Sequence, residues 1–201
     1  MVYLLNKYIM TNVIDIEYYR KIYNTIIEML TDREFFVPDS IRSLIIDSVI
    51  QINFVVSKQD SLSSLQVFFI DDNKIGINNI KQFITTLQEK NITNAIVVYE
   101  HSLTSFAKHF IDSCKDINIE YFLCKELYTN ITKHILVPKH VILNTNERKL
   151  LLHSIKAHIK NLPIIKKSDP ICRYFGAKPG DIFKIYRSNY NITSIYYRIC
   201  C

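Results

Sequence analysis

The sequence predicts an α/β domain followed by a small α+β domain, and two observations support this division. Strand-like and helix-like segments alternate over residues 65–122, which is typical of crossover connections onto one partly parallel sheet. The charge also changes sign along the chain. Residues 1–131 hold 12 Lys and Arg against 16 Asp and Glu, whereas residues 132–201 hold 13 against 3. We therefore expect two domains, at residues 1–131 and 132–201.

The first domain is expected to be a sheet with flanking helices. Its clearest helix is predicted over 78–90, where apolar residues recur at the spacing of one helix face; they are Ile80, Phe83, Ile84 and Leu87. A longer helix is expected over 12–30, and another after a cap at Ser102 or Thr104. Runs of β-branched and aromatic residues predict strands at 49–56, 65–70, 94–99 and 117–122.

The second domain is predicted to follow a β-α-α-β-β order with a mixed sheet. Asn144 and Glu147 have the spacing of a capping box, so a helix should begin after Asn144, and Pro163 should end it. Asp169-Pro170 is a typical helix start, and Gly176 is a typical helix end. Strands are expected around these helices, at 139–143, 182–187 and 194–200.

Composition and motif content argue against several classes of function. The five cysteines include no Cys-x-x-Cys pair, which favours reduced thiols over a disulfide framework or a zinc site. The histidines of the second domain, His140 among them, lack companion ligands at metal spacing, so we expect no metal and no cofactor. There is no P-loop and no nucleophile elbow, and polar residues interrupt the longest apolar stretch, so we expect neither catalysis nor a membrane span.

Short motifs in the second domain occur in a specific order. They are HILVPKH at 134–140, NLP at 161–163, SDPICRYFG at 168–176, KPGD at 178–181, KIYR at 184–187 and YRI at 197–199. Together they closely resemble the C-terminal domain of the fifth subunit of eukaryotic multisubunit RNA polymerases, which is the archaeal H subunit. The first domain is similar to the eukaryotic N-terminal half at 80–83, 88–91, 97–99 and 130–132. The resemblance covers most of the chain and is weakest over residues 1–60.

This resemblance implies a non-catalytic structural subunit of a DNA-directed RNA polymerase. In the family, the C-terminal domain docks on the largest subunit and serves assembly. The N-terminal domain is a jaw domain, forming part of the lower jaw near downstream DNA. The expected partners are therefore the largest and the other polymerase subunits, with weak contact to downstream duplex DNA and none to a membrane. The magnesium-binding aspartates of polymerisation belong to the largest subunit.

The resemblance also implies a set of subunit-interface residues in the second domain. The glycines should adopt backbone angles closed to other residues, the aromatics should serve core and interface, and the arginines should pair with acidic groups of a larger partner. The set is His140, Arg173, Tyr174, Phe175, Gly176, Gly180, Arg187 and Arg198.

Two segments depart from the family pattern. The family's jaw helix usually opens with Thr-Pro-Ser-Ala, whereas this chain reads Leu103-Thr104-Ser105-Phe106-Ala107 and lacks the proline. Thr104 and Ser105 stay DNA-proximal candidates, because amides at a helix start can face a phosphate. The final hairpin lacks the family's Gly and Arg over 189–194, so its turn must differ.

Two other classes of function stay open on the sequence alone. A free-standing basic nucleic-acid-binding transcription factor would use the positive charge of residues 132–201, and its affinity would fall steeply with salt. A nuclease would suit the α/β pattern, but it needs an acidic-x-Lys pair on a strand. Glu89 directly precedes Lys90, and Phe122 stands where Lys would follow Glu120.

The scarcity of Gly and Ala beside abundant Ile, Asn and Lys indicates an AT-rich genome. Such a genome fits a protist or a large DNA virus that encodes its own polymerase. The chain is therefore expected in the nucleus if it is cellular, and in the host cytoplasm and virion if it is viral.

Overall fold

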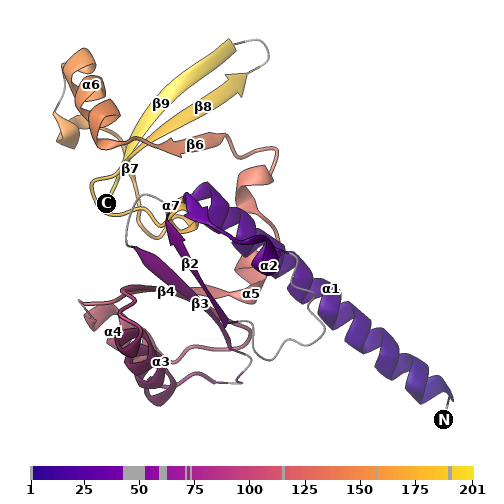
Figure 1. Ribbon diagram of the computed structural model, residues 1–201. Coiled ribbons are helices and arrows are strands. Elements are labelled where there is room, and N and C mark those ends of the chain that lie inside the picture. The colour runs from indigo at the N-terminus through magenta and orange to yellow at the C-terminus, as the bar shows by residue number, and fades with distance from the viewer. Residues whose placement is uncertain are drawn as a thin grey trace. The chain divides into compact units, whose positions relative to one another are not determined.

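The computed structural model describes residues 2–42, 53–58, 63–70, 72, 74–114, 116–156, 158–189 and 192–201. The chain forms two compact units, Met1–Thr129 and Asn130–Cys201 (Figure 1). Each unit combines helices with its own mixed sheet, so the α/β character predicted from the sequence is present. The division into functional domains at residue 131 stays a prediction.

The sheet of the first unit has the order β1-β2-β3-β4-β5. Its first three strands pair antiparallel, and β3, β4 and β5 pair parallel. The strands are β1 (Phe35–Phe36), β2 (Asn53–Lys58), β3 (Ser64–Ile70), β4 (Asn94–Tyr99) and β5 (Asn118–Leu123). The strand expected over 49–56 begins outside the described residues, since 49–52 are not described, and it continues to Lys58.

Helices α3 (Ile77–Glu89) and α4 (Ser105–Ser113) lie side by side on one face of this sheet (Figure 1). The crossovers β3-α3-β4 and β4-α4-β5 advance in the same direction, and right-handed crossovers of this kind place both helices on the same face. The predicted apolar stripe of α3 packs against alternate residues of β4, which point to that face. Asn91 follows the helix with φ 53°, a left-handed conformation that asparagine tolerates at a helix end.

Helix α1 (Val2–Asp32) covers the opposite face and is longer than the 12–30 expected. The ring of Tyr23 packs edge-on against Phe54 of β2, with centroids 5.8 Å apart. Just beyond the helix, the Arg33 guanidinium donates to both carboxylate oxygens of Glu120 in β5, at 2.9 and 2.7 Å. Three layers result: α1, the sheet, and the α3–α4 pair.

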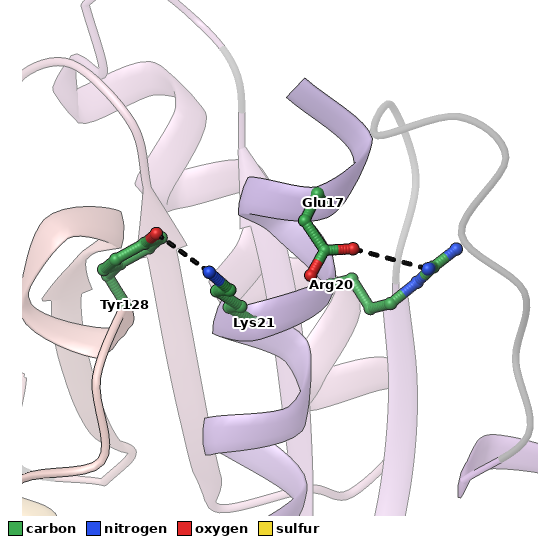
Figure 2. A network of polar contacts seen from close by, with 4 residues as sticks. All are labelled: Glu17, Arg20, Lys21 and Tyr128. Carbon is green, nitrogen blue, oxygen red and sulfur yellow. Dashed lines mark hydrogen bonds and ion pairs between the residues drawn. The ribbon is translucent and has the colours of Figure 1, made fainter. Parts of the chain in front are cut away.

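A short helix, α5 (Cys124–Leu127), follows β5 directly and was not predicted. Lys21 on α1 donates a hydrogen bond of 3.1 Å to the hydroxyl of Tyr128, at the end of α5 (Figure 2). Close to Lys21 on α1, Glu17 and Arg20 form an ion pair of 3.4 Å whose side chains are both about half exposed (Figure 2). Exposed pairs of this kind contribute little to stability.

The second unit has a four-stranded sheet of order β6-β8-β9-β7. Strand β7 runs parallel to β9, and the other neighbours pair antiparallel. Its strands are β6 (Lys139–Ile142), β7 (Ile164–Ile165), β8 (Ile182–Asn189) and β9 (Ile192–Cys200), and its helices are η2 (Ile131–Lys133), α6 (Thr145–Ile155), η3 (Ile159–Asn161) and α7 (Pro170–Phe175). Strand β7 was missing from the predicted β-α-α-β-β order because two residues are too short to leave a periodic signal.

The start of α6 agrees with the sequence, but its end does not. Asn144 accepts from the backbone N–H of Glu147, and the Glu147 carboxylate accepts from the backbone N–H of Asn144, each at 2.9 Å, which is the expected capping box. The helix ends at Ile155, well before Pro163, because Lys156 adopts the left-handed conformation with φ 47°. Pro163 would disrupt only the turn of helix before it, so the left-handed Lys156, earlier in the chain, determines where α6 ends.

The two faces of the second sheet carry separate cores. Helix α7 covers one face through Ile171 and Cys172, which pack with Phe183 and Ile185 of β8. Helix α6 covers the other face through Leu151, which packs with apolar residues of both long strands, including Ile182 and Ile199. Alternate residues of β8 thus belong to different cores.

Gly176 provides a test of the predicted glycine conformations. It ends α7 with φ 61° and ψ 35°, and Gly180 has φ 96°; both lie in the region that favours glycine. We expect Gly176→Ala to lower the free energy of unfolding by about 1 kcal/mol, measured by urea denaturation. Gly76→Ala is the matched control, because Gly76 has φ −98° and an added Cβ would meet nothing closer than 3.8 Å. Equal effects of the two substitutions would contradict the backbone role.

Candidate functional site

Helix α7 contains three of the predicted interface residues, and side-chain contacts fix the position of two of them. Asp169 accepts from the N–H of Ile171 at 2.9 Å and so caps the helix, as the Asp-Pro pair indicated. Tyr174 is buried, and its hydroxyl accepts from the side-chain amide of Asn130 at 3.1 Å. Phe175 packs edge-on against Tyr174 and Phe183. Tyr174 and Phe175 thus connect η2, α7 and β8, and their contact with a partner stays a prediction.

His140 of β6 is half buried beside this aromatic cluster, and its ring lies edge-on to Phe183. Its Nδ1 lies 2.6 Å from the carbonyl oxygen of Pro138. A carbonyl only accepts, so Nδ1 carries the proton, and Nε2 is the acceptor of the neutral ring. Burial lowers the pKa of His140 below its ordinary 6.5, an effect that the Pro138 carbonyl opposes.

The lowered pKa of His140 predicts a pH dependence of stability. Between the folded and unfolded pKa values the unfolded chain binds more protons, so stability rises with pH there. His140 contributes fully above pH 6.5, and its contribution is lost as the pH falls below that value. We expect urea unfolding at about pH 7.5 and about pH 5.5 to show a smaller difference in His140→Gln than in the parent chain. Equal differences would contradict this role.

Arg187 and Arg198 share one face of the β8–β9 hairpin. Phe183 pairs with Arg198 and Arg187 pairs with Ser194, so both arginines follow the same alternation. The Arg187 guanidinium lies 4.8 Å from the centroid of the Tyr196 ring, a cation–π contact. Arg198 donates to the carbonyl of Ile164 at 3.2 Å. Arg173, the third predicted arginine, is half buried on α7.

The three carboxylates of the second unit all accept hydrogen bonds from backbone N–H groups. Glu147 and Asp169 cap helices, and Asp181 accepts from the N–H of Lys178 at 2.7 Å. These are the three carboxylates in a unit that holds 13 Lys and Arg. The unit therefore carries a strong excess of positive charge.

Thr104 and Ser105 lie at the start of α4 in the first unit. The Thr104 hydroxyl accepts from the N–H of Ala107 at 3.2 Å, which settles the choice between the two caps that the sequence allowed. Ser105 is exposed as the first residue of the helix. The next residue, Phe106, has 76% of its surface exposed. A role near DNA stays a prediction for Thr104 and Ser105.

Sequence reasoning did not single out several exposed apolar side chains. Ile135 and Leu136, between η2 and β6, are 94% and 82% exposed. Ile195 and Tyr196 of β9 are 47% and 48% exposed. The signal for the first pair was available, since apolar residues in a loop next to Pro138 have no strand or helix to bury them. The second pair lies in a strand, where exposure depends on which neighbours cover it.

The part of the chain that the structure describes contains no cluster of three His, Cys, Asp or Glu side chains that could hold a metal ion. In the same part, no helix is long and apolar enough to cross a membrane. Glu120, which the nuclease hypothesis would use, is engaged by Arg33. Burial raises the pKa of the Cys172 thiol to about 12, which disfavours the reactive thiolate.

Comparison with known proteins places the chain in a family. The sequence model for "RNA polymerase Rpb5, C-terminal domain" matches residues 129–200. A Dictyostelium discoideum protein named "DNA-directed RNA polymerases I, II, and III subunit rpabc1" is 34% identical over 194 residues, covering 92% of this chain and 98% of the relative. The RPABC1 subunits of Caenorhabditis briggsae and Caenorhabditis elegans are each 41% identical over 134 residues, covering 66% of this chain and 64% of the relative.

These matches define a subunit of a multisubunit enzyme rather than an enzyme in its own right. The chain belongs to the Rpb5 family of RNA polymerase subunits, whose members are non-catalytic. The match to the Dictyostelium protein spans both units, so the family assignment covers the α/β unit as well as the basic one.

Proposed function

We propose that this protein is a structural subunit of a DNA-directed RNA polymerase that docks on the largest subunit through residues 132–201. The observation that carries the proposal is the nearly full-length similarity to a shared polymerase subunit. The excess of cations in the second unit supports it, because the carboxylates there are held by the backbone and leave the charge for a partner. The eight interface residues named from the sequence belong to this proposal.

We further propose that the first unit forms part of the lower jaw near downstream duplex DNA. This unit is acidic overall, so it does not attract the phosphate backbone as a whole. Local contacts must therefore carry any approach to DNA. The α4 start offers a capped helix end with exposed Ser105 and Phe106. Weak DNA contact is consistent with such a small site.

The first experiment is affinity purification of the tagged full-length chain from its source cells at high salt. We expect the large polymerase subunits to copurify. Their absence would overturn the proposal. Immunofluorescence in the same cells tests the location that follows: nuclear staining is expected for a cellular polymerase, whereas staining in the cytoplasm of infected cells would support the viral alternative.

A gel-shift series with the isolated chain tests the alternative of a free-standing basic transcription factor, which the charge of the second unit favours. As a polymerase subunit, the chain is expected to bind naked duplex DNA feebly at every salt concentration. Tight binding at low salt that falls by about 10³-fold or more between about 50 and 200 mM salt would support the free-standing factor instead.

A further inference from the structure

The outer edge of β9 is open over most of its length. Strand β7 pairs with β9 only at Ile199 and Cys200. Among the described residues, no strand pairs with this edge between Ile192 and Arg198. Strand β6 likewise reaches only as far as Tyr186 of β8. The distal part of the β8–β9 hairpin is therefore a two-stranded ribbon that extends past both outer strands (Figure 1).

The hydrogen bonds at the base of β9 determine which backbone groups face the open edge. The N–H of Ile199 donates to the carbonyl of Pro163, next to β7, whereas the N–H of Cys200 donates to Asp181, next to β8. The register with β8 continues without a bulge from Ile192 to Ile199. Alternation along a strand then turns the N–H and C=O groups of Ile195 and Tyr197 toward the open edge.

This edge lacks the features that usually prevent strand addition. The segment from Ile192 to Tyr197 contains no charged residue and no proline, and the side chain of Ile195 is half exposed. Free edges are normally blunted by Lys, Pro, a bulge or a covering element. An open, uncharged edge is a template for an added strand.

The charge of the second unit indicates which kind of strand adds to the open edge of β9. A second copy of this chain would bring together two units that each hold 13 cations and 3 carboxylates, so self-pairing is disfavoured. An acidic strand is favoured, because Arg187 and Arg198 lie on one face of the hairpin. Ile195 lies on the other face with its side chain half exposed, which calls for an apolar neighbour, whereas Tyr197 on that face already packs against the core under α6.

We propose that an extended segment of another polymerase subunit, alternating acidic and apolar side chains, adds as a strand to β9 beside Ile195 and Tyr197. This inference rests on the proposed function and specifies how the second unit contacts its partner. The backbone groups of Ile195 and Tyr197 supply register, Arg187 and Arg198 face the acidic side chains, and the half-exposed Ile195 faces the apolar ones.

Hydrogen exchange in the parent chain tests the backbone part. In the free chain, the amides of Ile195 and Tyr197 should exchange fast, while those of Ser194 and Tyr196, which face β8, should be protected. In the purified polymerase, the two outer amides should slow by about 100-fold or more. Unchanged exchange of these amides in the complex would overturn the inference.

Ile195→Pro tests the same edge by substitution. Proline is tolerated in an edge strand where its missing N–H faces solvent, so the free chain should keep its fold, checked by circular dichroism. The added strand should be lost, and the yield of copurified polymerase should fall on the order of tenfold. Ile195→Ala is the matched control, since it keeps the N–H. Equal yields for the two variants would contradict strand addition.

Arg187→Glu tests the charge of the occupant. We expect it to weaken association on the order of tenfold, whereas Lys149→Glu, an exposed residue of α6 with the same change in charge, should have little effect. Equal effects of the two substitutions would overturn the proposal of an acidic partner strand. A dimer of the isolated parent chain in analytical sedimentation would indicate instead that a second copy of this chain adds to the edge. If the parent chain copurifies no polymerase subunits, the proposed function itself is wrong. If the parent chain copurifies them but the variants behave alike, only strand addition is wrong.

Discussion

Replacing Phe183 with alanine should destabilise the second unit by about 3–5 kcal/mol. The side chain is fully buried, and its ring contacts both His140 and Phe175, so it joins β6, β8 and α7. Truncation removes a large apolar group and leaves a cavity that β8, held between two neighbouring strands, cannot close. Urea denaturation followed by far-UV circular dichroism measures the change.

Leu150→Ala is the matched control for Phe183→Ala. Leu150 lies on α6 with an exposed side chain, so its truncation should change the free energy of unfolding by no more than about 0.5 kcal/mol. Under the proposed function, Phe183→Ala should also abolish copurification of the polymerase while the first unit stays folded. A parent-like stability of Phe183→Ala would contradict the packing described for this core.

Breaking the pair between Arg33 and Glu120 should have the second largest effect. The side chains are 6% and 22% exposed, and the guanidinium makes two hydrogen bonds with the carboxylate. Replacing Arg33 with methionine keeps most of the apolar stem but leaves the Glu120 charge without this partner. Loss of one member of a buried pair costs about 3–5 kcal/mol, and the partial exposure of Glu120 places the expected loss near 3 kcal/mol.

Arg20→Met is the matched control, because Arg20 forms an exposed ion pair with Glu17 on α1 (Figure 2). Its loss should change stability by less than about 0.5 kcal/mol. The double variant Arg33→Met with Glu120→Gln should recover part of the loss, since no uncompensated charge remains. Equal destabilisation by Arg33→Met and Arg20→Met would show that burial of the first pair contributes nothing.

Local sequence signals predicted local structure well. The apolar spacing from Ile80 to Leu87 located α3, the Asn144–Glu147 pair located the start of α6, and Asp169 with Gly176 located both ends of α7. Each signal acts over about two turns of helix or less. The backbone conformation at these positions depends on residues nearby in the sequence, so it could be predicted without knowledge of the tertiary structure.

Errors arose where distant segments decide the outcome. Strand β7 exists because Ile164 and Ile165 meet the end of β9, more than thirty residues away in the sequence. The pairing of Arg33 with Glu120 joins residues 87 positions apart, and neither residue carried a sequence signal for it.

The sequence by itself determined the family, the charge division and most helices and strands, because motif order, composition and periodicity are properties of the chain. Only the tertiary structure decided which edge of the second sheet is left uncovered. Ile195 and Tyr197 are indistinguishable in sequence from the residues of a central strand, and the open edge beside them exists because β7 is short. Exposure of a strand edge depends on what its neighbours fail to cover, and that is a property of the assembled sheet.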